Sequence, residues 1–345
     1  MVWPVNARLP SAFVRRTPLP MLRLFGPHCP TKPVDPASLD VLPPGVIWVD
    51  LLNPTHEEEK LAEKLVGTNI PTRDELLEIE PSSRLYERGK RAYMTMSVLY
   101  GVDQHRPAND PIGFILTDSH LVTVRYVDPK PFIIFAEHVY ADPELAGDAH
   151  AMLIRLLDAV IDRLADEFEV LGHEIDGISK RIFKQHTHRK GTTPELRLEA
   201  LLMRIGKAQR TLALLREGAL SGLRLLTFLP TTAALADEEL HRRHIQSLVA
   251  DAQALADHSN FLGDNLTFLL DASLGLISLE QNNVMKLFSV FAVVFMPPTL
   301  IAGIYGMNFE HMPELKWVDG YPMAVLAMLL SAILPFMYAR RKGWL

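Results

Sequence analysis

Residues 287–309 read LFSVFAVVFMPPTLIAGIYGMNF, and none of these 23 side chains is charged. Folded as an α-helix, with a rise of about 1.5 Å per residue, the stretch would be about 35 Å long, which exceeds the roughly 30 Å of a bilayer's hydrocarbon core. A second stretch of 20 uncharged residues, 320–339, reads GYPMAVLAMLLSAILPFMYA. Two neighbouring stretches of this length are typical of membrane spans. We therefore predict two helices in the lipid bilayer, at residues 285–305 and 321–339.

The basic residues that flank the two stretches predict their orientation. Lys286 stands at the start of the first, and Arg340, Arg341 and Lys342 follow the second. Lys and Arg accumulate on the cytoplasmic side of membrane proteins, so both termini are expected in the cytoplasm, with residues 340–345 as a basic tail. The protein is then a two-span protein of the plasma (inner) membrane.

The loop between the spans, residues 306–320, is expected to be extracytoplasmic. It is acidic, with Glu310, Glu314 and Asp319 against Lys316. Carboxylates beside an ion pathway raise the local concentration of cations, an effect that salt screens. We therefore expect Glu310 and Glu314 to attract divalent cations.

The composition excludes several classes of protein. Of the 345 residues, 48% are hydrophobic, which excludes a disordered chain. Cys29 is the one cysteine, so a disulfide scaffold is excluded. The formal net charge of −6 disfavours nucleic acid as a partner.

The residues before the spans predict a cytosolic assembly. Residues 1–34 carry five Lys or Arg side chains and no acidic one, and their prolines interrupt any secretory signal, so we expect a basic N-terminal extension. Residues 35–146 alternate strand-like runs with capped helices, which indicates an α/β domain with a mixed sheet. Residues 147–230 show the helical period and are expected to form long cytosolic helices.

A stalk helix is predicted at residues 231–284, running directly into the first span. Between Pro230 and Pro297 lie 66 residues without a proline, which as one helix would extend about 100 Å. Counting by sevens along it gives three acidic residues, and the same face inside the span is small, polar or Met. These positions are Asp257, Asp264 and Asp271, followed by Asn282, Met285, Met296, Thr299 and Gly303.

Two interpretations of this face remain open. One helix cannot enclose a pore, so if the face lines water the protein must be a cyclic oligomer. Alternatively, the small residues pack the two spans against each other, and the aspartates are ordinary stalk surface.

Any ion pathway here is constrained by the absence of a charged side chain from residues 287–309 and 320–339. A charge in the bilayer is costly and would hold a divalent ion too tightly for release. Mg²⁺ prefers oxygen ligands and gives up its water reluctantly. Oxygens of Asn282, Thr299, Gly303 and Asn308 can contact an ion that keeps its water shell, while the Met side chains can form apolar constrictions.

The segment Tyr305-Gly306-Met307-Asn308 at the outer end of the first span resembles the signature of the CorA family of magnesium transport proteins, which carry GMN at this place. The surrounding MPPTLIAGIYGMNFEHMPELKW, the earlier EQNNVMKLFSV, the GYP at Gly320 and the basic RRKGWL end are also similar to that family. The strong similarity covers residues 271–345.

The resemblance implies an α+β cytosolic αβα funnel domain, a stalk helix continuous with the first span, and a homopentamer whose pore is lined by five copies of that span. It implies that Asn308, with Gly306 and Met307, forms the outer ion site and selectivity filter. The pore-lining positions it implies are Asn282, Met285, Met296, Thr299 and Gly303. Mg²⁺ would be both transported and regulatory, closing the pore from acidic stalk sites, for which Asp271 is the best match, with Asp264 and Asp257. Co²⁺ and Ni²⁺ are implied as further substrates, and the membrane potential as the driving force.

Other functions are distinguishable. One alternative is a Zn²⁺ transporter of the same superfamily, similar to ZntB. Such proteins often replace the middle Met of the motif, so the presence of Met307 argues against this alternative. A membrane-anchored structural or signalling protein would not depend on Asn308. An enzyme is not expected, because the sequence has no Walker loop, no Gly-rich dinucleotide turn and no HExxH. His173-Glu174 lacks the second His of a zinc protease, and His241 and His244 suit a solvated helix face better than a metal site.

Overall fold

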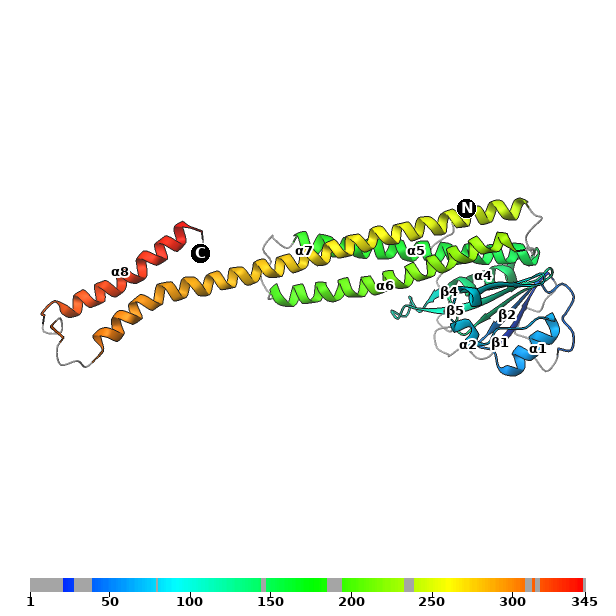
Figure 1. Ribbon diagram of the computed structural model, residues 1–345, viewed down its shortest axis with the longest axis horizontal. Coiled ribbons are helices and arrows are strands. Elements are labelled where there is room, and N and C mark those ends of the chain that lie inside the picture. The colour runs from blue at the N-terminus through cyan, green and yellow to red at the C-terminus, as the bar shows by residue number, and fades with distance from the viewer. Residues whose placement is uncertain are drawn as a thin grey trace. The chain divides into compact units, whose positions relative to one another are not determined.

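The computed structural model describes residues 21–27, 39–78, 80–143, 147–184, 194–232, 239–307, 312–313 and 317–343. The chain divides into two units, of which the first holds residues 1–184 and 203–267 and the second holds residues 185–202 and 268–345. Figure 1 follows the chain by colour from its N-terminal sheet to its C-terminal helices. The two units are described separately below.

A six-stranded sheet in the order β1-β2-β6-β5-β4-β3 organises the first unit. Its strands are β1 (Met21–Phe25), β2 (Trp48–Leu52), β3 (Leu85–Arg88), β4 (Arg91–Tyr100), β5 (Ala108–Leu116) and β6 (Leu121–Arg125). β2 and β6 pair in parallel and the other neighbours pair antiparallel, so the mixed sheet predicted from the sequence is confirmed.

Strand β1 corrects the N-terminal boundary drawn from the sequence. Residues 21–25 were assigned to a basic extension over 1–34, but they pair with β2 from Met21↔Leu52 to Phe25↔Trp48. The strand is only five residues long, and its buried Leu22 and Leu24 alternate with a basic residue, so its apolar pattern is too short to stand out beside the prolines. The α/β domain therefore begins before residue 35.

Helices cover both faces of the sheet. On one face, Ala62 of α1 (His56–Val66) and Leu76 of α2 (Arg73–Leu77) join a core with Val49, Ile115 and other strand residues. On the other face, α4 (Lys130–Ala141) brings Phe132 to 6.1 Å from Phe114 and Phe135 to 5.7 Å from Trp48 between ring centroids. This gives the predicted αβα layering.

Capping boxes set the starts of the two short helices on the first face. Thr55 and Glu58 at α1, and Thr72 and Glu75 at α2, exchange side-chain and backbone hydrogen bonds. The first box was recognisable in the sequence as a threonine followed by acidic residues. A further turn of helix, α3 (Pro81–Arg84), leads into β3.

Long helices make up the remainder: α5 (Ala149–Lys184), α6 (Pro194–Phe228), α7 (Glu239–Tyr305) and α8 (Gly320–Arg341). The predicted continuity of stalk and first span is confirmed, because α7 is a single helix of 67 residues. Its first residue is Glu239, not 231, since a 3₁₀ turn occupies Leu229–Thr231. Pro230 suits that turn because it has no N–H to donate.

A buried ion pair links the two parallel strands at the centre of the sheet. Arg125 on β6 donates from Nη2 to Oδ2 of Asp50 on β2 at 2.8 Å and from Nε to Oδ1 at 2.9 Å, and neither side chain is accessible to solvent. Thr123 donates to the same carboxylate, and Arg125 also contacts Asp128. Burial opposes ionisation of Asp50, but Arg125 outweighs it and keeps the pKa of this carboxyl below its usual range.

Asp50→Ala is expected to lower the free energy of unfolding of the sheet domain by about 3 kcal/mol, because it leaves the Arg125 charge buried without its main partner. Urea denaturation of the purified full chain, followed by near-ultraviolet circular dichroism, measures this change. Lys90→Gln is a matched control: the exposed pair Lys90–Asp118 at 3.9 Å should contribute less than about 1 kcal/mol. Equal effects of the two substitutions on the free energy of unfolding would contradict a special role for the buried Asp50–Arg125 pair.

Candidate functional site

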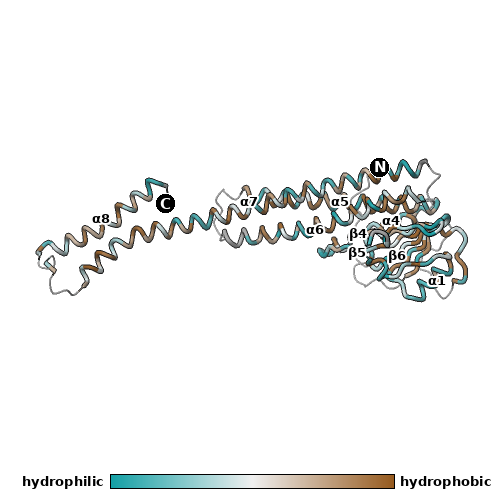
Figure 2. The backbone as a smooth tube through the Cα atoms, viewed as in Figure 1, coloured by the Kyte–Doolittle hydropathy of each residue, from teal (hydrophilic) through white to brown (hydrophobic). Residues whose placement is uncertain are grey.

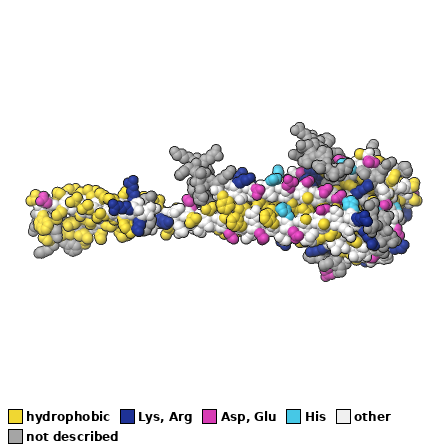
Figure 3. All heavy atoms as spheres, turned by 90° about the horizontal axis from the view of Figure 1, so that it is seen from above, with side chains coloured by type: hydrophobic (Ala, Val, Ile, Leu, Met, Phe, Trp, Pro, Cys, Tyr) yellow, Lys and Arg dark blue, Asp and Glu magenta, His cyan; other side chains and the backbone are white. Residues whose placement is uncertain are grey.

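Two helices, α7 and α8, are long and apolar enough to cross a membrane. The relevant windows of α7 and α8 have mean hydropathies of 2.1 and 1.9, and only 6% and 11% of their residues are buried in the chain. A core helix of a water-soluble protein with this hydropathy would be mostly buried. Figure 2 shows hydrophobic residues along both helices, and in Figure 3 hydrophobic side chains cover their surface. These apolar surfaces require lipid or protein to cover them.

The residues predicted to line a pathway lie on the exposed surface of α7. Asn282 and Met285 come first along the helix, and Met296, Thr299 and Gly303 follow. Met285 and Met296 are 64% and 68% exposed, so no other part of the described chain covers either of them.

A groove of about 710 Å³ runs along the outer part of α7 and brings several of these residues together. It is lined by Ala292, Phe295, Met296, Thr299, Leu300, Gly303, Ile304 and Met307. Phe295, which is not among the predicted pathway residues, also lines the groove. Its long side chain, about 100° around the helix from Met296, reaches the groove's edge. Leu300 and Ile304 also line the groove but were not predicted. Each directly follows a predicted residue, Thr299 or Gly303, and so lies about 100° around the helix from it.

The hydroxyl groups on this face present oxygen rather than hydrogen. Thr299 Oγ1 donates to the carbonyl oxygen of Phe295 at 2.7 Å, and Ser289 Oγ donates to that of Met285 at 2.9 Å. Because the single hydroxyl proton is used within the helix, the lone pairs remain as acceptors. Such oxygens suit a cation or its bound water, which donates hydrogen bonds.

Two consecutive prolines interrupt the hydrogen-bond ladder of α7 beside this groove. Pro297 and Pro298 lie inside the helix and have no N–H to donate to the carbonyls of Val293 and Val294. In a bilayer such carbonyls are tolerated only where protein or water meets them. The groove-lining part of α7 is thus suited to a protein contact or a hydrated cavity.

The signature motif stands at the end of α7. The helix ends at Tyr305, and the N–H groups of Gly306 and Met307 donate to the carbonyls of Ala302 and Ile304. Met307 lines the groove. The predicted residues Asn308, Glu310 and Glu314 lie outside the described residues.

The three stalk aspartates are exposed on α7. Asp257 accepts a hydrogen bond from Gln253 Nε2 at 3.2 Å. Asp264 and Asp271 form no ion pair with any other described residue. Across the described ranges of this single chain, no group of three or more His, Cys, Asp or Glu side chains is arranged to hold a metal ion.

The two histidines weighed as metal ligands have other neighbours within the first unit. His244 Nε2 lies 3.6 Å from Asp158 Oδ2 on α5, and the His241 ring packs at 6.3 Å from that of His150.

Comparisons with known proteins agree with these features. Residues 44–341 match the sequence model of the family described as CorA-like Mg²⁺ transporter protein. The chain is 33% identical over 301 residues to a protein of Salmonella typhimurium named magnesium transport protein CorA, covering 87% of this chain and 92% of that one. The complete structure of the CorA magnesium transporter from Methanocaldococcus jannaschii aligns with a TM-score of 0.77 at 18% identity, covering 96% of this chain and all of that one.

A more distant fold match concerns the alternative weighed above. The ZntB cytoplasmic domain from Vibrio parahaemolyticus aligns with a TM-score of 0.55 at 8% identity, covering 75% of this chain and 99% of that one. At this identity the match shows the shared fold alone. The family match, by contrast, includes strands β2 to β6 of the sheet, the long helices and both apolar helices, and the chain is therefore a member of the CorA-like Mg²⁺ transporter family.

Proposed function

We propose that the protein is a channel for Mg²⁺ uptake across the plasma (inner) membrane, driven by the membrane potential and closed by intracellular Mg²⁺. The observation that carries this proposal is the family match over residues 44–341, which includes both apolar helices, together with relatives named magnesium transport proteins. Co²⁺ and Ni²⁺ are further substrates in this proposal.

The working unit in this proposal is a homopentamer. A single α7 presents its groove and its exposed Met side chains to the outside, and one helix cannot enclose a pore. Five copies arranged around an axis would turn the exposed face of α7 toward a common centre. The remaining apolar surface of α7 and α8 would then face lipid or neighbouring subunits.

The uncharged span favours passage of an ion that keeps its water shell. Glu310 and Glu314 attract cations to the outer mouth, and a ring of Asn308 amide oxygens, supported by Gly306 and Met307, receives the hydrated ion. Thr299 and Asn282 offer further oxygens, and Gly303 leaves room beside its backbone because nothing lies within 4 Å of a Cβ placed there. Met285 and Met296 form the apolar constrictions that close the path by dewetting.

Regulation in this proposal uses the exposed stalk aspartates. Asp271, with Asp264 and Asp257, lacks a cationic partner within the described chain, so a divalent ion bridging to another subunit would neutralise its charge. Bound Mg²⁺ stabilises the closed arrangement of the stalks, and its loss at low cytosolic Mg²⁺ releases them. The basic residues around the spans support a cytoplasmic location for both termini.

A Zn²⁺ transporter is the second candidate. The fold match to a ZntB cytoplasmic domain supports only the architecture, whereas Met307 preserves the GMN motif. A purely anchoring role for the helices is the third, and it makes no use of Asn308.

Asn308→Ala is expected to reduce Mg²⁺ uptake by at least about ten-fold, because five amide oxygens are lost from one ring and each contributes about 1 kcal/mol to ion binding. Uptake is measured with ²⁸Mg²⁺ in a transport-deficient bacterial strain, with the membrane content of each variant checked by immunoblot. Asn260→Ala, at an exposed position of α7 outside the proposed pathway, is a matched amide deletion and should leave uptake unchanged. Unchanged uptake in Asn308→Ala would support the anchoring role and contradict the channel.

Thr299→Val removes one hydroxyl oxygen while keeping the side-chain shape, and it is expected to lower the Mg²⁺ conductance about three-fold or more, because a neutral hydrogen bond contributes about 1 kcal/mol. Single-channel or macroscopic current recording measures it. Thr299→Ser, which keeps the oxygen, should retain most of the conductance. Loss of conductance in both variants would indicate a packing role for the Thr299 methyl group instead.

Asp271→Asn is expected to raise the Mg²⁺ concentration needed for half-maximal closure by about five-fold, the lower end of typical coupling between sites. Protection of the stalk from limited proteolysis, titrated with Mg²⁺, measures this concentration. Because Asp257 and Asp264 share the role, the triple Asn variant should lose protection altogether. Wild-type protection in the triple variant would contradict Mg²⁺ sensing by this stripe.

A further inference from the structure

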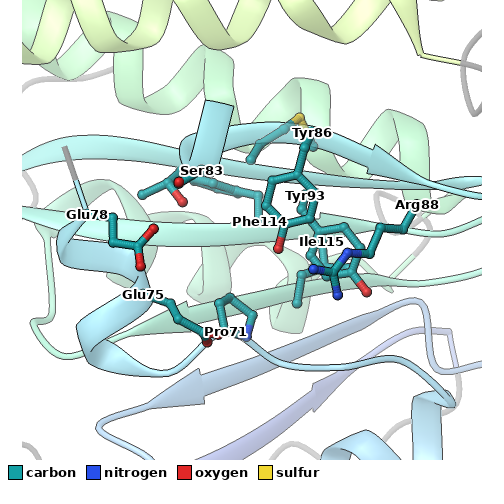
Figure 4. A pocket seen from close by; sticks show the side chains of 11 residues that line it. Pro71, Glu75, Glu78, Ser83, Tyr86, Arg88, Tyr93, Phe114 and Ile115 are labelled. Atoms are coloured by element: carbon teal, nitrogen blue, oxygen red, sulfur yellow. The ribbon is translucent and has the colours of Figure 1, made fainter. Parts of the chain in front are cut away.

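A pocket of about 240 Å³ lies on the α2 side of the sheet, beside strands β3 and β4 (Figure 4). It has no part in the proposed transport function. The residues that matter for its chemistry are Glu75, Glu78, Tyr86, Arg88, Tyr93 and Ile115. All of them belong to the first unit of the chain.

Strand register explains why these side chains share one surface. Tyr86 pairs with Tyr93 across β3 and β4, and Tyr93 pairs with Ile115 across β4 and β5, so the three side chains form a row on one face. Arg88 follows Tyr86 by two residues and therefore points to the same face. Helix α2 lies against β5 at Gly113, where a Cβ would be 2.9 Å from Leu76 Cδ2. This close approach brings the end of α2 to the edge of the tyrosine row.

Two stacked tyrosines form the middle of the pocket. The rings of Tyr86 and Tyr93 lie 4.8 Å apart at an angle of 8°, and the hydroxyl groups of Tyr93 and Thr68 are 2.8 Å apart. Burial raises the pKa of Tyr86. The charge of Arg88 lowers this pKa, and Tyr93, Glu75 and Glu78 raise it further. The Tyr86 hydroxyl therefore stays protonated at neutral pH and can donate a hydrogen bond.

Carboxylates gather at one end of the pocket. Glu75 Oε2 accepts hydrogen bonds from the N–H and hydroxyl of Thr72 at 2.8 and 3.1 Å, which holds this carboxylate in place. Glu78, just after α2, forms no ion pair with another described residue. In Figure 4 both carboxylates lie on the same side of the tyrosine pair.

One guanidinium group, that of Arg88, lines the pocket at the other end. Arg88 lies on the opposite side of the tyrosine pair in Figure 4, with its Cζ 5.3 Å from the centre of the Tyr86 ring. Its cross-strand partner is Arg91, and like charges at directly opposed positions destabilise a sheet. Neither arginine forms an ion pair within the described part of the chain. An anion at this end would relieve the repulsion.

We propose that this pocket binds a small zwitterion, an ω-amino acid, with its ammonium group at Glu75 and Glu78 and its carboxylate at Arg88. The tyrosine pair and Ile115 contact the carbon chain between the two charges, and the Tyr86 hydroxyl donates to the ligand carboxylate. The charged residues at both ends are exposed, so a ligand can enter without rearrangement of the sheet.

Binding is tested by isothermal titration of the full chain in detergent with an ω-amino acid series: glycine, β-alanine, 4-aminobutyrate and 6-aminohexanoate. The proposal predicts that one chain length binds best, and that butylammonium and butyrate, which carry one charge each, bind at least about ten-fold more weakly than the best zwitterion. Glu78→Gln and Arg88→Gln should each lower the affinity for the best-binding zwitterion by about ten-fold or more.

Glu199→Gln and Arg216→Gln, at exposed positions on α6, are matched controls and should leave the affinity unchanged. Unaltered thermal unfolding of all four variants confirms that they fold. Equal binding of butylammonium and the zwitterion would overturn the assignment in favour of a simple cation site, and equal binding of butyrate would overturn it in favour of an anion site. Absence of binding at millimolar concentrations, or binding unchanged in both pocket variants, would also overturn it.

Discussion

A bilayer satisfies no backbone hydrogen bonds, and this constraint shapes everything from residue 239 onward. One helix, α7, carries charged residues in its first part and none near its end. Because it is a single helix, its backbone hydrogen bonds continue from the charged part into the apolar part. The ladder is interrupted inside the apolar part at Pro297 and Pro298, where the groove of α7 lies. The interruption fits a helix that meets other protein or water at this point, and it would be costly in a helix surrounded by lipid alone.

In the proposed channel, a span without charged side chains would serve a divalent ion through neutral oxygen acceptors. Oxygen acceptors such as that of Thr299, whose proton is held by the Phe295 carbonyl, favour the water shell of a cation without trapping the ion. The charges are kept outside the span, on the exposed aspartates of the stalk and the carboxylates of the loop. In the proposed pentamer each of these groups is repeated five times, so weak individual contacts become a ring.

Sequence periodicity predicted much of the architecture, and its failures have physical causes. Long elements with a sustained pattern, such as α5, α6 and α7, were found because many residues contribute to each pattern. The five-residue strand β1 was missed because Leu22 and Leu24 are too few to outweigh nearby prolines. The buried pair Asp50–Arg125 joins residues 75 positions apart, and only the parallel pairing of β2 and β6 brings them together.

The candidate site likewise contains residues that the sequence predicted and residues that it did not. Helical spacing in steps of three, four and seven found Met296, Thr299 and Gly303, which line one groove, but it left out Phe295 because it treats side chains as points on a cylinder. The proposed role of Asn308 rests on the motif, and those of Glu310 and Glu314 rest on the acidic charge of the loop, because these three residues lie outside the described ranges. The pocket on the α2 side of the sheet has no sequence signature, because only the fold brings Glu75 and Glu78 beside Tyr93 of β4 and Ile115 of β5.

Ion flux into proteoliposomes that contain the purified protein and an imposed potassium diffusion potential tests the central claim most directly. The account predicts Mg²⁺ entry without ATP, increasing as the interior becomes more negative and suppressed when Mg²⁺ is present on the side of the stalk. Flux of Zn²⁺ without Mg²⁺, or Mg²⁺ entry no faster than in protein-free liposomes, would contradict it.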